Sequence, residues 1–264
     1  MFSNLSRVRV LALCALPVVA LLAVVGTAPL PFAVAQPGTT ADVLGTNEGR
    51  PIITITGAPV RPTTGQLRMT TILATGPSTE VDLGDVADAW FRTDRAVYPR
   101  AMVYPTGKSD EEVTKHNLRQ MEESQDAATL AALNHVGKSP KDVKVSLHLA
   151  DVGGPSAGLL FSLGIVDKLV GNGAGGELTG GKIVAGTGTI DADGAVGAVG
   201  GVSLKTQAAG RDGATVFLVP KAECDDAEAE LPKGMRLIPV STLDDAVASL
   251  TALGRGQEAK VPSC

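Results

Sequence analysis

A serine between a predicted strand and a predicted helix is the first residue whose surroundings favour chemistry. Residues 143–149 are typical of a buried strand, and an apolar helix is predicted to begin near Pro155, so Ser156 lies at the join. The preceding Gly153 and Gly154 allow a tight bend with bare N–H groups. A hydroxyl there faces the positive end of a helix dipole, which stabilises developing negative charge. Ser156 is therefore a candidate nucleophile, the alternative being an ordinary turn and helix cap.

A nucleophilic serine needs a base, and the histidines lie in the wrong order for one familiar arrangement. Residues 154–158 also spell the G-x-S-x-G turn of α/β-hydrolases, in which the acid and the histidine follow the serine. Here all the histidines precede it: His116, His135 and His148. The order disfavours an esterase of the α/β-hydrolase type.

Lysine is the remaining candidate base, because an amine among apolar groups loses its charge more readily. Lys205 lies in residues 198–209, a stretch of small and apolar residues that opens another predicted helix. The other downstream lysines lie in polar or acidic segments or after a glycine-rich loop: Lys168, Lys182, Lys221, Lys233 and Lys260. We predict that Lys205 is the base, although considered alone it would be an ordinary surface lysine.

Together these stretches resemble the proteolytic domain of Lon proteases, which use a serine-lysine dyad. Residues 155–158 match the serine motif of that family, and residues 199–205 match its lysine motif, in which Gly-Gly precedes the lysine by four residues. Residues 186–190 resemble the strand that carries a threonine beside the dyad, which maps onto Thr187. The likeness covers about residues 113–252 in the right order.

The resemblance implies an α+β fold and a serine endopeptidase that needs no metal or organic cofactor. Ser156 would attack the scissile carbonyl and Lys205 would take its proton, while Thr187 would orient the amine. The backbone around the Gly153-Gly154-Pro155 turn would support the oxyanion. Protein or peptide substrates would bind as an added strand. The alternative is a non-catalytic peptide-binding or scaffold protein on the same fold.

Two departures from the family pattern point to a subfamily. Many Lon domains carry an acidic residue where this chain has Gly153, and glycine there resembles the membrane-anchored Lon-like proteases of Gram-positive bacteria. The nearest acid is Asp151, which with His148 is a candidate substrate contact. That subfamily often carries a PDZ domain of roughly 80 to 100 residues, and the span between Leu73 and Asp110 is too short for one.

The N-terminus is predicted to be a membrane-spanning or signal segment. Arg7 and Arg9 precede an uncharged run over residues 10–35, which is long enough to cross a bilayer with the remainder outside the cytoplasm. Ala33-Val-Ala35 also fits a signal-peptidase site, so the segment is either a retained anchor or a cleaved signal peptide. Both readings place the domain beyond the membrane.

The predicted organisation has four parts. They are an anchor or signal peptide (1–36), a linker and small β-rich segment (37–108), a Lon-type proteolytic domain (109–253) and a loose tail (254–264). Within them, residues 37–50 are predicted to be a polar linker and Trp90 a core anchor, and the acidic residues 223–230 a solvated helix face. Cys224 and Cys264 could form a disulfide outside the cytoplasm or remain two thiols.

Composition excludes several classes of partner. A net charge of −5 argues against nucleic acid. Residues 176–183 nearly spell a phosphate loop, but Ile183 replaces the required Ser or Thr, so we expect no ATP hydrolysis by this chain. The resemblance leaves a homo-oligomeric ring and a monomer both open.

Overall fold

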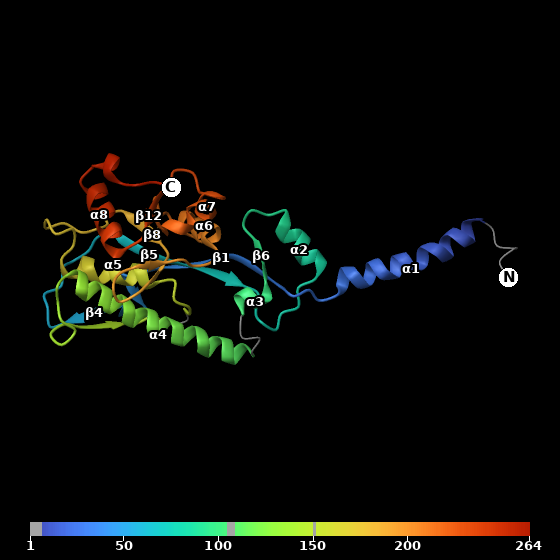
Figure 1. The fold of residues 1–264 in the computed structure, drawn as a ribbon, viewed down its shortest axis with the longest axis horizontal. Helices are drawn as coiled ribbons and strands as arrows, with labels where there is room; N and C mark the ends of the chain where they lie inside the picture. The colour runs from blue at the N-terminus through green and yellow to red at the C-terminus, as the bar shows by residue number, and fades with distance from the viewer. Residues whose placement is uncertain (1–6, 105–108, 150–151) are drawn as a thin grey trace. The chain divides into compact units, whose positions relative to one another are not determined.

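The computed structural model describes residues 7–104, 109–149 and 152–264, which form two compact units (Figure 1). The small unit comprises residues 1–35 and 74–110, and the large unit comprises residues 36–73 and 111–264. Helices and strands are mixed in the large unit around a curled sheet, which agrees with the α+β fold class that the resemblance implied.

The sheet of the large unit is mainly parallel. Its strands lie in the order β12 (Arg236–Val240), β11 (Val216–Pro220), β8 (Ile183–Gly186), β5 (Gln66–Ala74) and β1 (Phe32–Asp42). The first four are parallel to one another, with Phe217 opposite Leu237 and Val184 opposite Leu67. All of β11 is buried, as expected for a parallel strand covered on both faces.

Helices cover both faces of this sheet, and alternate residues of β11 point to different cores. Leu218 packs in the main core with the buried helix α5 (Gly158–Leu169) and with α8 (Leu243–Gly254). Phe217 packs in a second core with α6 (Val202–Arg211) and α7 (Cys224–Glu228). The long helix α4 (Asp110–His135) contributes its buried stripe to the main core.

Three short antiparallel pairs complete the large unit: β2 (Thr46–Asn47) with β3 (Arg50–Pro51), β4 (Ile53–Thr56) with β7 (Lys144–Leu147), and β9 (Thr189–Ile190) with β10 (Val196–Gly197). The prediction of a polar linker over residues 37–50 is wrong. These residues continue β1 and form the β2–β3 pair, and the intervening Val43 is fully buried in the main core. Residues 36–73 share a compact unit with residues 111–264, because β4 and β5 pair with β7 and β8.

The small unit contains helix α1 (Arg7–Thr27), helix α2 (Leu83–Trp90), strand β6 (Ala96–Pro99) and helix α3 (Arg100–Val103). Strand β6 pairs antiparallel with residues 32–35 at the start of β1. None of the residues of α1 is buried, and its mean hydropathy is 2.7 over a length that suits either a membrane span or a signal sequence. Trp90 is not a core residue as predicted, because 79% of its surface is exposed.

The C-terminal tail is fixed, not loose as predicted. Cys264 forms a disulfide with Cys224, with 5.4 Å between their Cα atoms. The guanidinium of Arg236 donates hydrogen bonds to the carbonyls of Glu258 and Val261, and Val261 is buried. The tail, with its short 3-10 helix η2 (Glu258–Lys260), therefore packs on the large unit. Of the two predicted alternatives for these cysteines, the structure has the disulfide.

Candidate active site

Ser156 lies in a turn immediately before α5 and is half-buried. The helix begins at Gly158, three residues later than the predicted start at Pro155. The amide of Gly158 reaches the carbonyl of Pro155 at 3.5 Å, so this first turn is looser than a helical turn. Ser156 therefore stands outside the helix, at its N-terminal end.

Helix α4 holds this turn from one side. The Gly154 amide donates to the Asn117 carbonyl at 3.0 Å, and the Ser124 hydroxyl donates to the Pro155 carbonyl at 3.0 Å. A Cβ atom added to Gly153 would lie 2.7 Å from the Cβ of Asn117, which is too close without movement of the helix. Glycine at the position where many Lon domains carry an acid thus has a local cause, the close approach of α4.

The segment between β8 and β9 holds the turn from another side. The Ser156 carbonyl accepts hydrogen bonds from the Gly188 amide at 3.0 Å and from the Thr187 hydroxyl at 3.2 Å. The Leu159 amide donates back to the Gly188 carbonyl at 3.2 Å. Thr187 is fully buried, so its hydroxyl is a fixed part of the site.

Lys205 lies on the first turns of α6, with only 3% of its surface exposed. Its Nζ donates a hydrogen bond to the Thr187 hydroxyl at 3.1 Å. Burial lowers the pKa of this amine to about 8, against the opposing effects of Glu223 and Asp226, whose negative charges favour the ammonium form. Such an amine is partly neutral near physiological pH, as a general base requires.

The glycine pair of the lysine motif turns the chain into α6. Gly201 precedes the helix with φ 67° and ψ 39°, a left-handed conformation that disfavours other residues. This turn sets the direction from which Lys205 enters the core, four residues later. Glycine at this position therefore has a conformational cause.

Two acidic residues support the same turn. Most of the acidic residues of 223–230 are exposed, as predicted, but Glu223 is partly buried, and both Glu223 and Asp226 accept backbone hydrogen bonds. Both carboxylate oxygens of Glu223 accept from the Val199 amide, at 3.1 and 3.0 Å, and Asp226 accepts from the Val202 amide at 2.9 Å. The first turn of a helix leaves amides unpaired, and carboxylates are well suited to them. Sequence reasoning missed this role because the partners lie 24 residues apart. The supporting residues Asn117 and Ser124 likewise carry no local signal.

The structure thus brings Ser156, Thr187 and Lys205 together, with Thr187 as the link. The Ser156 hydroxyl and the Lys205 amine are not hydrogen-bonded to each other. Among the described residues, Ser156 Oγ has no hydrogen-bond partner. The residues predicted to support the oxyanion differ in whether their backbone N–H is available. Pro155 has no N–H, and the Gly154 amide is occupied by Asn117, whereas Gly153 and Ser156 donate no backbone hydrogen bond within the described chain.

The other candidate residues are separate from this link. The His148 amide extends the β4–β7 pairing by donating to Ile52, and its buried Nε2 has no partner in the described chain. Asp151 lies outside the described residues. His135 contacts Asp244 on α8, and no histidine forms a hydrogen bond with Ser156 in the part of the chain that the structure describes.

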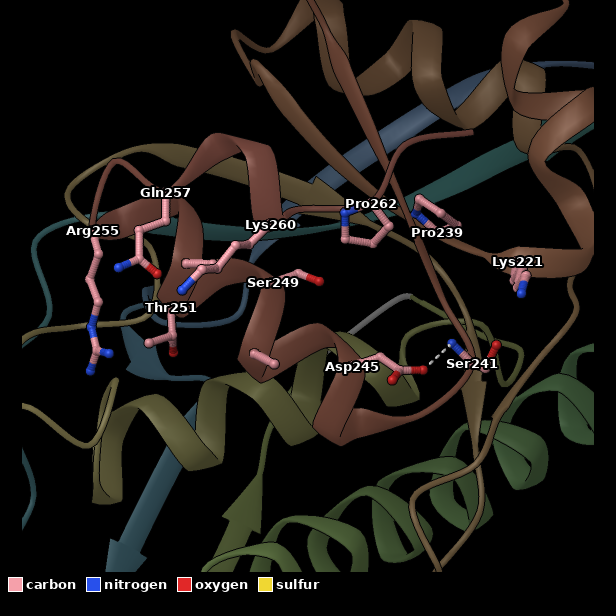
Figure 2. Close-up of a pocket in the computed structure, with 12 residues that line it drawn as sticks. Lys221, Pro239, Ser241, Asp245, Ser249, Thr251, Arg255, Gln257, Lys260 and Pro262 are labelled. Atoms are coloured by element: carbon pink, nitrogen blue, oxygen red, sulfur yellow. Dashed lines mark hydrogen bonds between the residues drawn. The ribbon is translucent and has the colours of Figure 1, made fainter.

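A cavity of about 650 Å³ lies elsewhere in the large unit, between α8 and the C-terminal tail (Figure 2). Its lining includes the exposed cations Lys221, Arg255 and Lys260, and the side chain of Asp245 accepts from the Ser241 amide at its edge (Figure 2). None of the Ser156, Thr187 and Lys205 side chains lines this cavity, so it is not where these three residues meet. Residues 7–104, 109–149 and 152–264 also contain no group of three or more His, Cys, Asp or Glu placed to hold a metal ion.

Comparison with known proteins identifies the family of the chain. Residues 104–252 match the family described as the Lon protease (S16) C-terminal proteolytic domain. The chain is 37% identical over 115 residues, 42% of its length, to Lon protease of Azospirillum brasilense, and 32% identical over 108 residues, 40% of its length, to Lon protease 1 of Myxococcus xanthus. Each match spans only 12% of the relative. The family match extends over more than half of the chain, which therefore belongs to the Lon protease (S16) C-terminal proteolytic domain family.

Proposed function

We propose that this protein is a serine endopeptidase in which Ser156 is the nucleophile and Lys205 the general base. The observation that carries the proposal is the buried amine of Lys205, which is hydrogen-bonded to the same threonine that holds the Ser156 carbonyl. An amine with a pKa of about 8 supplies a neutral base at neutral to slightly alkaline pH. Family membership supports the reaction class, peptide-bond hydrolysis.

The proposed reaction follows from these positions. Ser156 Oγ attacks the scissile carbonyl while Lys205 Nζ takes its proton, and the resulting ammonium returns a proton to the leaving amine. Water then attacks the acyl-enzyme with the same amine as base, which releases the acid product and restores the hydroxyl. The amides of Gly153 and Ser156 are the available donors for the oxyanion.

The proposed reaction requires Ser156 Oγ to approach Lys205 Nζ when a substrate binds. Catalytic hydrogen bonds are often long or absent without substrate and tighten in the complex, so the missing contact is compatible with the mechanism. Thr187 would act as a positioning residue, because it holds the amine on one side and the serine backbone on the other.

We further propose that a peptide substrate adds as a strand beside β7. This strand pairs with β4 on one side and ends at Leu147, nine residues before Ser156 in the sequence. In the described chain β4 is its only partner, which leaves one edge for main-chain hydrogen bonds to a substrate.

For its location, we propose an enzyme anchored by α1 with the large unit outside the cytoplasm. Two arginines precede the apolar run of α1, which supports a cytoplasmic N-terminus. The Cys224–Cys264 disulfide supports an oxidising compartment. We also propose that this chain cleaves peptides without hydrolysing ATP, since residues 176–183 lack the hydroxyl of a phosphate loop. We propose that it does so without a PDZ domain, since residues 74–104 form only α2, β6 and α3.

A fluorophosphonate probe tests the dyad. We expect covalent labelling of the full chain, no labelling of Ser156→Ala, and strongly reduced labelling of Lys205→Met. Lys260→Met is the matched control, because it removes a lysine of the exposed cavity and should label like the unmodified chain. Labelling that survives Lys205→Met would show that Lys205 is not the base.

One observation favours a second candidate, a non-catalytic peptide-binding or scaffold protein on the same fold. Ser156 Oγ has no partner among the described residues, so the dyad hydrogen bond is not formed in this state. A complete lack of labelling in the folded, unmodified chain, together with binding of unstructured peptides, would favour the scaffold over the peptidase.

A further inference from the structure

Helix α2 of the small unit carries an exposed apolar stripe. Leu83, Ala87, Trp90 and Phe91 follow one another at helical spacings of four, seven and eight residues from the first, which places them on one face. Leu83 is 45% exposed, Trp90 79% and Phe91 87%, whereas Ala89 on the other side is 2% exposed. The two largest apolar side chains of this helix therefore point away from the protein.

This stripe is unusual for the chain, and water is a poor environment for it. The whole sequence has one Trp and five Phe residues, and the adjacent Trp90 and Phe91 are the only exposed aromatic residues in the part of the chain that the structure describes. Each such side chain would release substantial free energy on leaving water. A contiguous exposed stripe of this kind marks a surface that another phase or molecule covers.

The stripe lies next to the end of the apolar helix α1. Helix α1 ends at Thr27, and three residues later the Leu30 amide donates to the Val81 carbonyl at 2.7 Å. Helix α2 begins at Leu83, two residues after Val81, and contacts α1 within the small unit (Figure 1). The stripe is thus fixed at the level where the proposed membrane span leaves the bilayer.

The composition of α2 identifies the environment that suits it. Tryptophan is enriched at the boundary between headgroups and acyl chains, and amphipathic helices with Trp, Phe and Leu lie in that plane. The nearby charged side chains already have partners in the small unit. The carboxylates of Asp82 and Asp85 accept hydrogen bonds from each other's backbone amides in a capping box, Arg95 pairs with Asp88, and Arg92 pairs with Asp94. Apolar contact, and not attraction to anionic lipids, would therefore drive the association.

We propose that Leu83, Trp90 and Phe91 insert into the headgroup and acyl-chain boundary of the bilayer that α1 crosses, so that α2 lies in the membrane surface. The inference rests on the proposed anchoring by α1. It adds a second membrane contact, made by a segment more than 50 residues further along the chain. The small unit would be held against the lipid surface by two elements instead of hanging from one.

The chain provides its own reporter, because Trp90 is its only tryptophan. The full chain is placed in phosphatidylcholine nanodiscs, and Trp90 fluorescence is measured with lipids brominated near the headgroup and with iodide in the water. We expect brominated lipid to reduce the emission at least about twofold and iodide to change it by less than about a tenth. Replacing a third of the lipid by an anionic one should leave both results unchanged.

Variants test whether the stripe inserts into the bilayer or only lies near it. Leu83→Ser combined with Phe91→Ser removes apolar contact without touching the reporter, and we expect weaker quenching by brominated lipid and stronger quenching by iodide. Val60→Ser is the matched control, because it changes an apolar residue of the large unit that is about as exposed as Leu83. It should leave the Trp90 signal as it is.

Flotation of the full chain with vesicles after alkaline extraction distinguishes the two proposals. If the chain floats and iodide quenches Trp90, the anchor stands and the insertion of α2 is wrong. If the chain floats and neither agent quenches Trp90, a protein partner or a second copy covers the stripe, which also overturns the inference. If the chain does not float and iodide quenches Trp90, the anchor is wrong and the inference falls with it.

Discussion

Two regions of the large unit show how differently cations behave in one protein. Lys205 is 3% exposed, has the Thr187 hydroxyl as its hydrogen-bond partner, and has a pKa lowered to about 8 by burial. Lys221, Arg255 and Lys260 line the cavity beside α8, where their side chains are exposed to water (Figure 2). An ammonium in water keeps its proton until strongly alkaline pH, whereas burial lowers the pH at which the amine becomes neutral. The comparison shows that burial of the amine, and not the presence of a lysine as such, is what would make Lys205 a general base.

The largest expected effect contrasts the two regions directly. Lys205→Met should reduce kcat/KM on a fluorogenic peptide by roughly a thousandfold or more, because the proposed base is lost. Lys260→Met should leave kcat/KM within a factor of about two, as expected for an exposed cation that takes no part in the reaction. Equal losses in both variants would mean that the buried amine has no special role.

Removal of the disulfide should affect stability without removing the base. Cys224→Ser combined with Cys264→Ser opens a link between residues 40 apart, and we expect the free energy of unfolding to fall by about 3 to 4 kcal/mol. Urea denaturation of the detergent-solubilised chain measures this loss. The tail residues that line the cavity would loosen, while the pH dependence of activity should keep its midpoint. A shifted midpoint would show that the disulfide also supports the Lys205 site.

The same Lys205→Met variant should be more stable than the unmodified chain at pH 7. A buried ammonium with a lowered pKa destabilises the native state by about 1 to 3 kcal/mol, and methionine avoids this effect. The cost is fully present below pH 8. Between pH 8 and about 10.5 the unfolded chain binds the additional proton, so native stability rises with pH and the advantage of methionine shrinks. A variant less stable than the parent at pH 7 would contradict burial of the charged form.

The pH profile of kcat/KM should rise through a midpoint near 8, because the neutral amine is the active form. A profile that is flat between pH 6 and 9 would remove Lys205 from the proposed role.

The smallest expected effect sharpens the electrostatic part of the comparison. Glu223→Gln removes a charge that favours the ammonium form but keeps an acceptor for the Val199 amide. We expect the midpoint of the profile to move down by a fraction of a pH unit. Lys221→Gln, which alters an exposed charge in the cavity, serves as the control. A midpoint that moves upward in Glu223→Gln would be inconsistent with an attraction between the Glu223 carboxylate and the Lys205 ammonium.

Much of the fold could be predicted from local patterns. The sequence pattern predicts a strand before Ser156, an apolar helix after it and a helix after the glycine pair, and the structure has β7, α5 and α6 there. The same patterns misread residues 37–50 and Trp90. A polar strand near the edge of a sheet has the same sequence pattern as a polar linker. The sequence of an amphipathic helix likewise does not show whether protein, lipid or water covers its apolar face.

The sequence by itself determined which residues are candidates: the spacing of Ser156, Thr187 and Lys205, the glycines before them, and an N-terminal run long enough for a membrane. Only the tertiary structure decided that Lys205 is buried against Thr187, that Glu223 and Asp226 hold the turn into its helix, and that Cys264 reaches Cys224. The physical reason is that helix and strand formation depend on neighbours along the chain. Burial and charge pairing instead depend on segments that meet only after folding.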